Sequence, residues 1–415
     1  MSRAPAIVAA LFLVLLAWVW GLPPGFLNTG LAQGGVALLS HTVDGGGTTQ
    51  SVGSGYSLGA TAGQADAGHL ASGDFALSGG FWTSSVGAPS GTPGLVVNTT
   101  SDADDGSCDA THCSLREAID AANANAGPDT IGFNIPGSDD GCDAGGVCAI
   151  QPASLLPFLT DDGTTIDGFT QPGASAGDNP VLKIVLDGYD NGQFSGMGIQ
   201  SASNTIRGLV IQRFTPFTAI AIFGVNASNN HIQENFIGTD AGGTEPRGNC
   251  TPPTSCAAIT IDSGAHDNVV GPDNLIAFNG LGPQISDQGT RGNTITRNSI
   301  HSNAQQGISL ASGGNDELAA PAVALAQATQ VTGTACPGCV VELFSDAEDE
   351  GAVYEGMTTA NNVGAWTFMK PGGLAGPNVT ATATDGDGNT SEFSAPVHVS
   401  ESGGWLLYVP LIAND

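Results

Sequence analysis

The sequence is poor in basic residues. Only nine of its 415 residues are Lys or Arg, against 39 Asp or Glu, which gives a net charge of −30 at pH 7. A chain with this balance repels nucleic acid and anionic lipid, so we expect neither as a partner. The acidic residues are not gathered in runs, which excludes a disordered acidic tail. Neutral surfaces and cations remain open as partners.

Long apolar runs are absent beyond the N-terminus, so we expect no transmembrane domain in the mature chain. The N-terminal run follows Arg3 and is broken by Gly and Pro, as in a secretory signal peptide. We expect a signal peptide at 1–32 with cleavage after Ala32, and an uncleaved anchor is the alternative. The protein is therefore predicted to be secreted or exposed on the cell surface.

Cysteine is missing from the first 107 residues, and the eight that follow form four close pairs. An even number in an exported chain predicts disulfides, and the short separations favour bonds within each pair. A redox or zinc role for the Cys-Pro-Gly-Cys pair is the alternative, but a strand-like segment follows it instead of a helix that would lower a thiol pKa. The predicted disulfides are Cys108–Cys113, Cys142–Cys148, Cys250–Cys256 and Cys336–Cys339.

Helical patterns are scarce, and the clearest begins at Ser114. Ser114 and Glu117 form the capping box S-x-x-E, which starts a helix, and Gly-Pro at 127–128 ends it. One apolar stripe follows at helical spacing: Leu115, Ala118, Ile119 and Ala122. The predicted helix, from Ser114 to Asn125, is too short to be stable alone, so it must cover a neighbouring structure.

A repeat occupies the middle of the chain. Four segments begin with N-x-[IV] and carry a second Ile, and a second strand-like segment follows each of them. The leading residues, spaced by 26, 38 and 25 positions, are Asn204, Asn230, Asn268 and Asn293. Short strands at this period predict a solenoid of stacked rungs, with the helix over its open end. We expect the recurrent Asn to form a structural ladder, with ligand binding as the alternative.

The regions on either side differ from the repeat. Gly-rich 33–82 predicts a small β module, and 83–94, composed of Ser, Pro and Gly, predicts a linker. Strand-like segments about ten residues apart over 317–399 predict an immunoglobulin-like β-sandwich. The apolar 400–415 is either a last strand or a sorting tail, and Pro410 favours the tail.

Three motifs resemble those of a known family. They are C-S-L-R-E-A-I (Cys113–Ile119), T-I-D-G-F-T-Q-P-G (Thr165–Gly173) and N-T-I-R-G-L-V-I (Asn204–Ile211). They resemble exported bacterial proteins that join a CSLREA-type N-terminal segment to right-handed parallel β-helix repeats of pectate-lyase-like architecture. The resemblance implies export and an all-β chain, with a helix-capped β-helix over 95–316. It does not by itself imply lyase activity.

The usual G-H-G and R-I-K signatures of β-helix hydrolases are absent. Asp262 and Asp287 are the catalytic candidates, because each lies two residues before the Gly that closes a second strand. They are 25 residues apart, so we expect them on adjacent rungs, separated by about 4.8 Å. Two carboxylates so placed are polar strand ends, a cation site or an acid/base pair.

Basic residues and one loop supply the binding candidates. Arg207 and Arg297 fall at similar rung positions, where they could bind sugar hydroxyls or a uronate, or pair with neighbouring acids. Asp385, Asp387 and Asn389 offer oxygen ligands at alternate positions, as in a fragment of a calcium loop. A β-hairpin turn is the alternative. Calcium is the one cofactor that the sequence suggests.

These features predict an exported structural or adhesive protein that contacts polysaccharide or another envelope surface through the β-helix flank. The alternative is a polysaccharide lyase or glycoside hydrolase acting on the same flank. An enzyme needs a clustered acid/base set in a groove, whereas a scaffold has scattered polar ladders. The geometry of the flank therefore distinguishes the two hypotheses.

Overall fold

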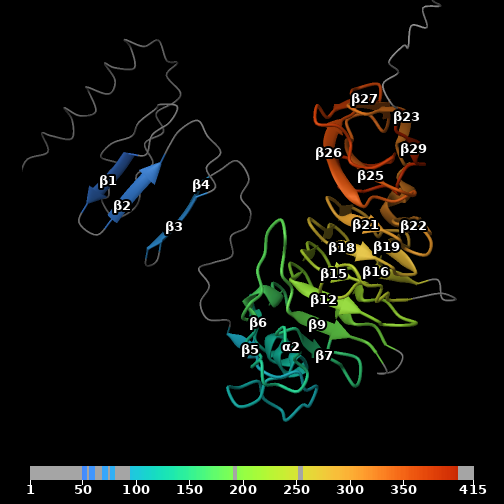
Figure 1. The fold of residues 1–415 in the computed structure, drawn as a ribbon. Helices are drawn as coiled ribbons and strands as arrows, with labels where there is room; N and C mark the ends of the chain where they lie inside the picture. Colours follow the sequence, from blue (N-terminus) through green and yellow to red (C-terminus); the bar gives the residue numbers. More distant parts are fainter. Residues whose placement is uncertain are drawn as a thin grey trace, which may run out of the picture. The chain divides into compact units, whose positions relative to one another are not determined.

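A computed structural model describes residues 94–189, 194–250 and 256–400, together with four strands nearer the N-terminus. The chain divides into two compact units, Met1–Ser90 and Gly91–Asp415. The first unit contains two antiparallel strand pairs, β1 (Thr49–Gly53) with β2 (Tyr56–Ala60) and β3 (Gly68–Ser72) with β4 (Phe75–Gly79) (Figure 1). The predicted signal peptide, its cleavage site, the tail from Glu401 and all of the predicted linker except Gly94 lie outside the described residues.

The second unit consists mainly of strands, which confirms the all-β prediction at this level. Its helix α2 (Leu115–Ala124) starts at the N-cap Ser114 and ends at the C-cap Asn125, as predicted. The Ser114 hydroxyl accepts the Glu117 N–H, and the Glu117 carboxylate accepts the Ser114 N–H, so the capping box is complete. The predicted apolar stripe is buried and joins the core of the sheets, since α2 packs on β5 and β6 (Figure 1).

Three parallel sheets follow, drawn from cyan through green to yellow in Figure 1. The seven-stranded sheet contains β5 (Leu95–Val97), β6 (Thr130–Phe133), β8 (Thr165–Asp167), β11 (Thr205–Arg207), β14 (His231–Gln233), β17 (Val269–Val270) and β20 (Thr294–Ile295). The six-stranded sheet contains β7 (Cys148–Ile150), β9 (Ile184–Asp187), β12 (Leu209–Gln212), β15 (Phe236–Ile237), β18 (Leu275–Ala277) and β21 (Ser299–His301). The five-stranded sheet contains β10 (Met197–Ile199), β13 (Ile220–Phe223), β16 (Ala257–Asp262), β19 (Leu281–Ser286) and β22 (Ser309–Ala311).

From β8 onward the chain visits the three sheets in turn, and we call each pass a rung. The sequence analysis was wrong in treating each N-x-[IV] segment as one strand. Each segment instead supplies two strands to two sheets, as β11 and β12 do. Residues with positive φ bend the chain between those two strands, at Gly208 (72°), Glu234 (56°), Asp273 (63°) and Arg297 (51°).

The core of this region is a set of in-register apolar columns. The seven-stranded sheet buries Ile131, Ile166, Ile206, Ile232, Val270 and Ile295 in one column. The other two sheets contribute equivalent columns to the same core. Burying each such side chain contributes about 1.5–3 kcal/mol, and it requires a neighbouring rung above and below.

Asparagine ladders occupy the corners between strands. In the first ladder, each backbone N–H and side-chain amide donates to the Oδ1 atom of the Asn one rung further on. This confirms the predicted ladder, which runs through Asn204, Asn230, Asn268 and Asn293 and continues to Asn315. Two more ladders were not predicted, Asn235–Asn274–Asn298 and Asn249–Asn279–Asn303.

Two antiparallel sheets complete the second unit, drawn in orange and red in Figure 1. One contains β23 (Ala322–Gln327), β24 (Gln330–Thr334) and β27 (Ala365–Met369). The other contains β26 (Val353–Thr359), β25 (Val340–Asp346), β28 (Asn378–Thr384) and β29 (Val397–His398). They enclose a second core around Val331, Leu343 and Trp366.

All four predicted disulfides are present. No helix among the described residues is long and apolar enough to cross a membrane. The bonds Cys108–Cys113 and Cys142–Cys148 lie before the first rung, the former directly ahead of α2 and the latter at the start of β7.

Candidate functional site

The two catalytic candidates lie close together but are not in register. Ile261 pairs with Ile285, so Ser286 follows at the position facing Asp262, and Asp287 is one residue further on. Asp287 also lies outside the strand, since its φ is 76°. Its carboxylate accepts the Ser263 N–H at 3.4 Å. Asp262 is half-buried and Asp287 is exposed. The one-residue offset places them on different parts of the turn instead of as a stacked pair.

A shallow hollow adjoins Asp287, lined by Gln288, Gly289, Ser312, Gly313, Asp316 and Glu317. Its best-placed carboxylate, Glu317, already accepts the Gly313 N–H at 3.0 Å. No basic side chain lines this hollow. The hollow therefore lacks a basic side chain for elimination, and of its two carboxylates, which belong to the adjacent residues Asp316 and Glu317, the second is already engaged with the backbone.

Arg207 belongs to a chain of charges across three rungs. Its guanidinium donates to the Asp167 carboxylate at 2.7 Å and lies 3.9 Å from the Glu234 carboxylate. It also lies over the Phe169 ring, 5.9 Å from the centroid. Burial raises the pKa of Glu234, while Arg207 acts in the opposite direction. Arg207 thus pairs with neighbouring acids, the second of the two roles considered for it, and carboxylates of the protein lie on both sides of it.

Arg297 does not share the position of Arg207. It is instead equivalent to Gly208, the positive-φ residue that follows Arg207. The backbone shows this equivalence, because the Gly208 N–H donates to the Glu234 carbonyl and the Asp273 N–H donates to the Arg297 carbonyl, so the positive-φ residues of successive rungs stack. The Arg297 side chain is exposed, and its backbone N–H donates to Glu342 at 3.0 Å. The two arginines therefore do not form one binding surface.

The loop Asp385–Asn389 adopts a tight turn. The Asp385 carboxylate accepts N–H groups of Asp387 and Asn389 and the Asn389 side-chain amide, at 2.9–3.0 Å. The Asn389 Oδ1 atom faces away from Asp385 and accepts the Gly292 N–H at 2.6 Å. The Asp385 carboxylate and the Asn389 Oδ1 atom are thus engaged as turn and contact acceptors, as in the hairpin alternative, whereas Asp387 is exposed.

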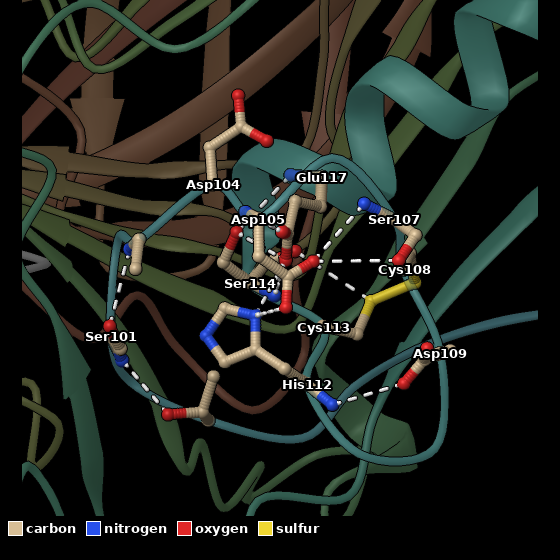
Figure 2. Close-up of polar contacts among 12 residues, drawn as sticks. Ser101, Asp104, Asp105, Ser107, Cys108, Asp109, His112, Cys113, Ser114 and Glu117 are labelled. Atoms are coloured by element: carbon tan, nitrogen blue, oxygen red, sulfur yellow. Dashed lines mark hydrogen bonds and ion pairs between the residues drawn. A yellow bond between two sulfur atoms is a disulfide. The ribbon is translucent and has the colours of Figure 1, made fainter.

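A cluster that the sequence analysis missed lies beside the start of α2 (Figure 2). His112 Nδ1 lies 2.9 Å from Glu117 Oε2 and 3.8 Å from Asp105 Oδ2. The Cys108–Cys113 disulfide closes the loop that carries His112, and Figure 2 shows the imidazole directed at the two carboxylates. The three ligand atoms lie within 4.8 Å of one another, a grouping that a small divalent cation could bridge.

The hydrogen bonds of Glu117 indicate whether its carboxylate stabilises the start of α2 or is free to bind a metal ion. Burial would raise the pKa of Glu117, but donors from Ser114 and Asp105, helped by His112, lower it to about 2. Oε2 accepts both the N–H and the hydroxyl of Ser114, and Oε1 accepts the Asp105 N–H at 2.6 Å. Both carboxylate oxygens therefore already accept hydrogen bonds, and the cluster is best described as charged groups that stabilise the N-terminus of α2.

A signal for this cluster is present in the sequence. His112 directly precedes Cys113, and the predicted disulfide and capping box already placed Cys113 beside Ser114 and Glu117. Combining these two predictions would have placed the imidazole next to the capping carboxylate. Asp105 gave no such signal, because its approach depends on the path of the whole loop.

The comparisons with known proteins add no assignment: no family model matches the chain, and no curated protein is similar to it. Functional inference therefore rests on the geometry above. On the described flank, Arg207 and Arg213 pair with neighbouring carboxylates, and the Asp287 carboxylate accepts a backbone N–H group.

Proposed function

We propose that this is an exported structural or adhesive protein of the CSLREA-type, parallel β-helix class. In this proposal the rungs form a right-handed parallel β-helix, α2 covers one end, and the C-terminal sheets form an immunoglobulin-like domain at the other. The flank of the rungs contacts polysaccharide or another envelope surface. The motifs Cys113–Ile119 and Asn204–Ile211, the parallel sheets and the four disulfides support it.

The observation that carries the proposal is the internal use of polar groups along the rungs. The ladder residues bond to one another, and all except the half-buried Asn303 are almost fully buried. On the flank, Arg207 pairs with Asp167 and Arg213 with Asp187. Asn, Arg and Asp side chains that bond to one another in this way stabilise a regular stack of rungs. Catalysis instead needs side chains that are free to exchange protons with a substrate.

Charge narrows the class of partner. With a net charge of −30, the chain repels polyuronates and other polyanions at low ionic strength. Neutral polysaccharide is therefore the polymer that we propose for the flank. Binding would depend on contacts repeated from rung to rung, and so would strengthen with polymer length.

The test uses the mature chain, Gln33–Asp415, with a panel of neutral and acidic polysaccharides in the presence of calcium. Retention on an insoluble neutral polymer, with no new chain ends detected by mass spectrometry, is the expected result. Cleavage that disappears in Asp262→Asn or Asp287→Asn would establish a lyase or hydrolase instead. Failure to bind any neutral or acidic polymer would reject the polysaccharide partner and leave a spacer.

A further inference from the structure

The last rung ends in three edge strands, β20, β21 and β22, one in each parallel sheet. The edge strand of a sheet presents N–H and C=O groups with no partner, and proteins cover such edges. Here the C-terminal sheets cover this edge. Ile300 and Gly351 exchange two backbone hydrogen bonds, at 2.9 and 2.8 Å, and Phe393 packs against the core of the rungs.

Side chains of the C-terminal region accept five more backbone N–H groups of the last rung and the segment before it. The backbone donors and their acceptors are Gly292 with Asn389, Ile295 with Thr390, Arg297 with Glu342, Asn303 with Glu350, and Leu310 with Glu392. All five distances lie between 2.6 and 3.0 Å. The C-terminal region thus replaces the rung that would otherwise come next.

Glu350 takes the place of the next asparagine in one of the ladders. Within the third ladder, Asn279 donates its N–H and its side-chain amide to Asn303 Oδ1, at 3.1 and 3.2 Å. Asn303 in turn donates its N–H and its side-chain amide to the two oxygens of Glu350, at 3.0 and 3.2 Å. Glu350 therefore stands where the Asn of a further rung would stand, but it carries a titratable group.

We propose that the junction between the last rung and the C-terminal sheets is a proton-sensitive joint, which is held most firmly when the Glu350 carboxyl is neutral. Glu350 is 3% exposed, and Asp346 and Asp349 of its own segment act on it with the same sign of charge. From the other elements packed here, His301 of β21 lies near Asp346 and Glu348. Neither β28 nor the segment after it brings a cation: Thr380 donates to the Glu350 carbonyl, and Glu392 binds Leu310.

The direction of the response follows from the environment of Glu350. Burial, with a smaller contribution from the two Asp residues, raises its pKa to about 7 from an ordinary 4.5, and the bonds from Asn303 offset this only in part. A carboxyl whose pKa is raised on folding stabilises the closed form most below pH 4.5, and that stabilisation is lost as pH rises to about 7. The joint is therefore expected to open more readily at alkaline than at acidic pH.

Hydrogen exchange of the full mature chain tests the joint. We expect the peptide containing Asn303, corrected for intrinsic exchange, to be about 25-fold better protected at about pH 5.5 than at about pH 8. Glu350→Gln offers a neutral acceptor that can serve both Asn303 donors, as Asn oxygens do in the ladders, so it should remove most of the pH difference. What remains comes from Glu342, which accepts the Arg297 N–H in the same junction and whose pKa burial also raises. Glu348→Gln, an exposed carboxylate of the same segment, is the matched control and should retain it.

Asp349→Asn gives a second, conservative test at an exposed position. Removing this negative charge should move the transition to lower pH without removing it, because burial remains the main cause. Equal protection of the wild-type peptide at the two pH values would overturn the proposal. So would a pH difference that persists undiminished in Glu350→Gln, since that would place the main titrating group elsewhere.

Discussion

Replacing Asn268 by Ala tests whether the asparagine ladders hold the rungs together. Asn268 is fully buried, and its side chain makes four hydrogen bonds. Its Oδ1 atom accepts from Asn230 N at 3.0 Å and Asn230 Nδ2 at 2.8 Å, and its Nδ2 donates to Ala227 O at 3.0 Å and Asn293 Oδ1 at 2.9 Å. At about 1 kcal/mol for each bond, and more where a buried group is left unpaired, the loss is about 3–5 kcal/mol.

Urea unfolding of the mature chain, followed by circular dichroism, measures this loss. Val269→Thr is the matched control, because it changes an outward-facing, half-buried residue of the same rung by an isosteric exchange. We expect the control to change the free energy of unfolding by less than about 0.5 kcal/mol. An Asn268→Ala loss below about 1 kcal/mol would refute the reasoning, since the ladder would then contribute no more than a surface contact.

Three further predictions concern the helix end of the rung stack and the flank. The pKa of Glu117, lowered to about 2 from 4.5, means that its stabilisation is present above pH 4.5 and is lost as pH falls towards 2. Glu117→Gln should remove about 1–3 kcal/mol of this acid-dependent stability, measured by unfolding at about pH 2.5 and 6; an unchanged pH profile would contradict it. Replacing Cys108 and Cys113 by Ser should cost about 2 kcal/mol in thermal unfolding, and no loss would show that the loop is held without the bond. Arg207→Gln should cost less than about 1 kcal/mol in urea unfolding because its side chain is 36% exposed; a larger loss would indicate a cooperative charge network.

Local features were predictable from the sequence because their causes are local. The capping box, the apolar stripe of α2 and the Gly-Pro stop all act within one helical turn, and the helix bounds were predicted correctly. The four disulfides join residues no more than six positions apart, so spacing alone indicated them. Asn204 and its equivalents were found because the N-x-[IV] pattern repeats along one line of residues.

The register of the strands and the positions of the bends were harder to predict from the sequence. The sequence steps between Asn268 and Asn293 suggested a uniform offset of 25, but the five-stranded sheet pairs Ile261 with Ile285 at an offset of 24, and the extra residue is accommodated in the turn. The bend at Gly208 was hidden because Glu234, Asp273 and Arg297 adopt the same positive φ without being glycine. Such conformations depend on neighbouring rungs, which a local pattern does not contain.

The candidate sites illustrate the same limit. The pairing of Arg207 with Asp167 joins residues 40 positions apart, and that of Asn303 with Glu350 joins residues 47 apart. Neither contact has a sequence signature, because each follows from how rungs and sheets stack. The cluster around His112 is intermediate, since the disulfide brings two of its elements together within a short stretch.

The two ends of the rung stack are closed by carboxylates with opposite responses to protons. Glu117 stabilises the first end only when charged, because donors from Ser114 and Asp105 surround it. Glu350 favours the neutral form at the other end, because it is buried beside Asp346 and Asp349. Acidification below pH 4.5 therefore weakens the helix end, while a rise towards pH 7 weakens the junction with the C-terminal sheets. Each response acts on one end of the stack, so we expect the stack to be most resistant to unfolding in mildly acidic solution, near pH 4.5, where the two losses meet.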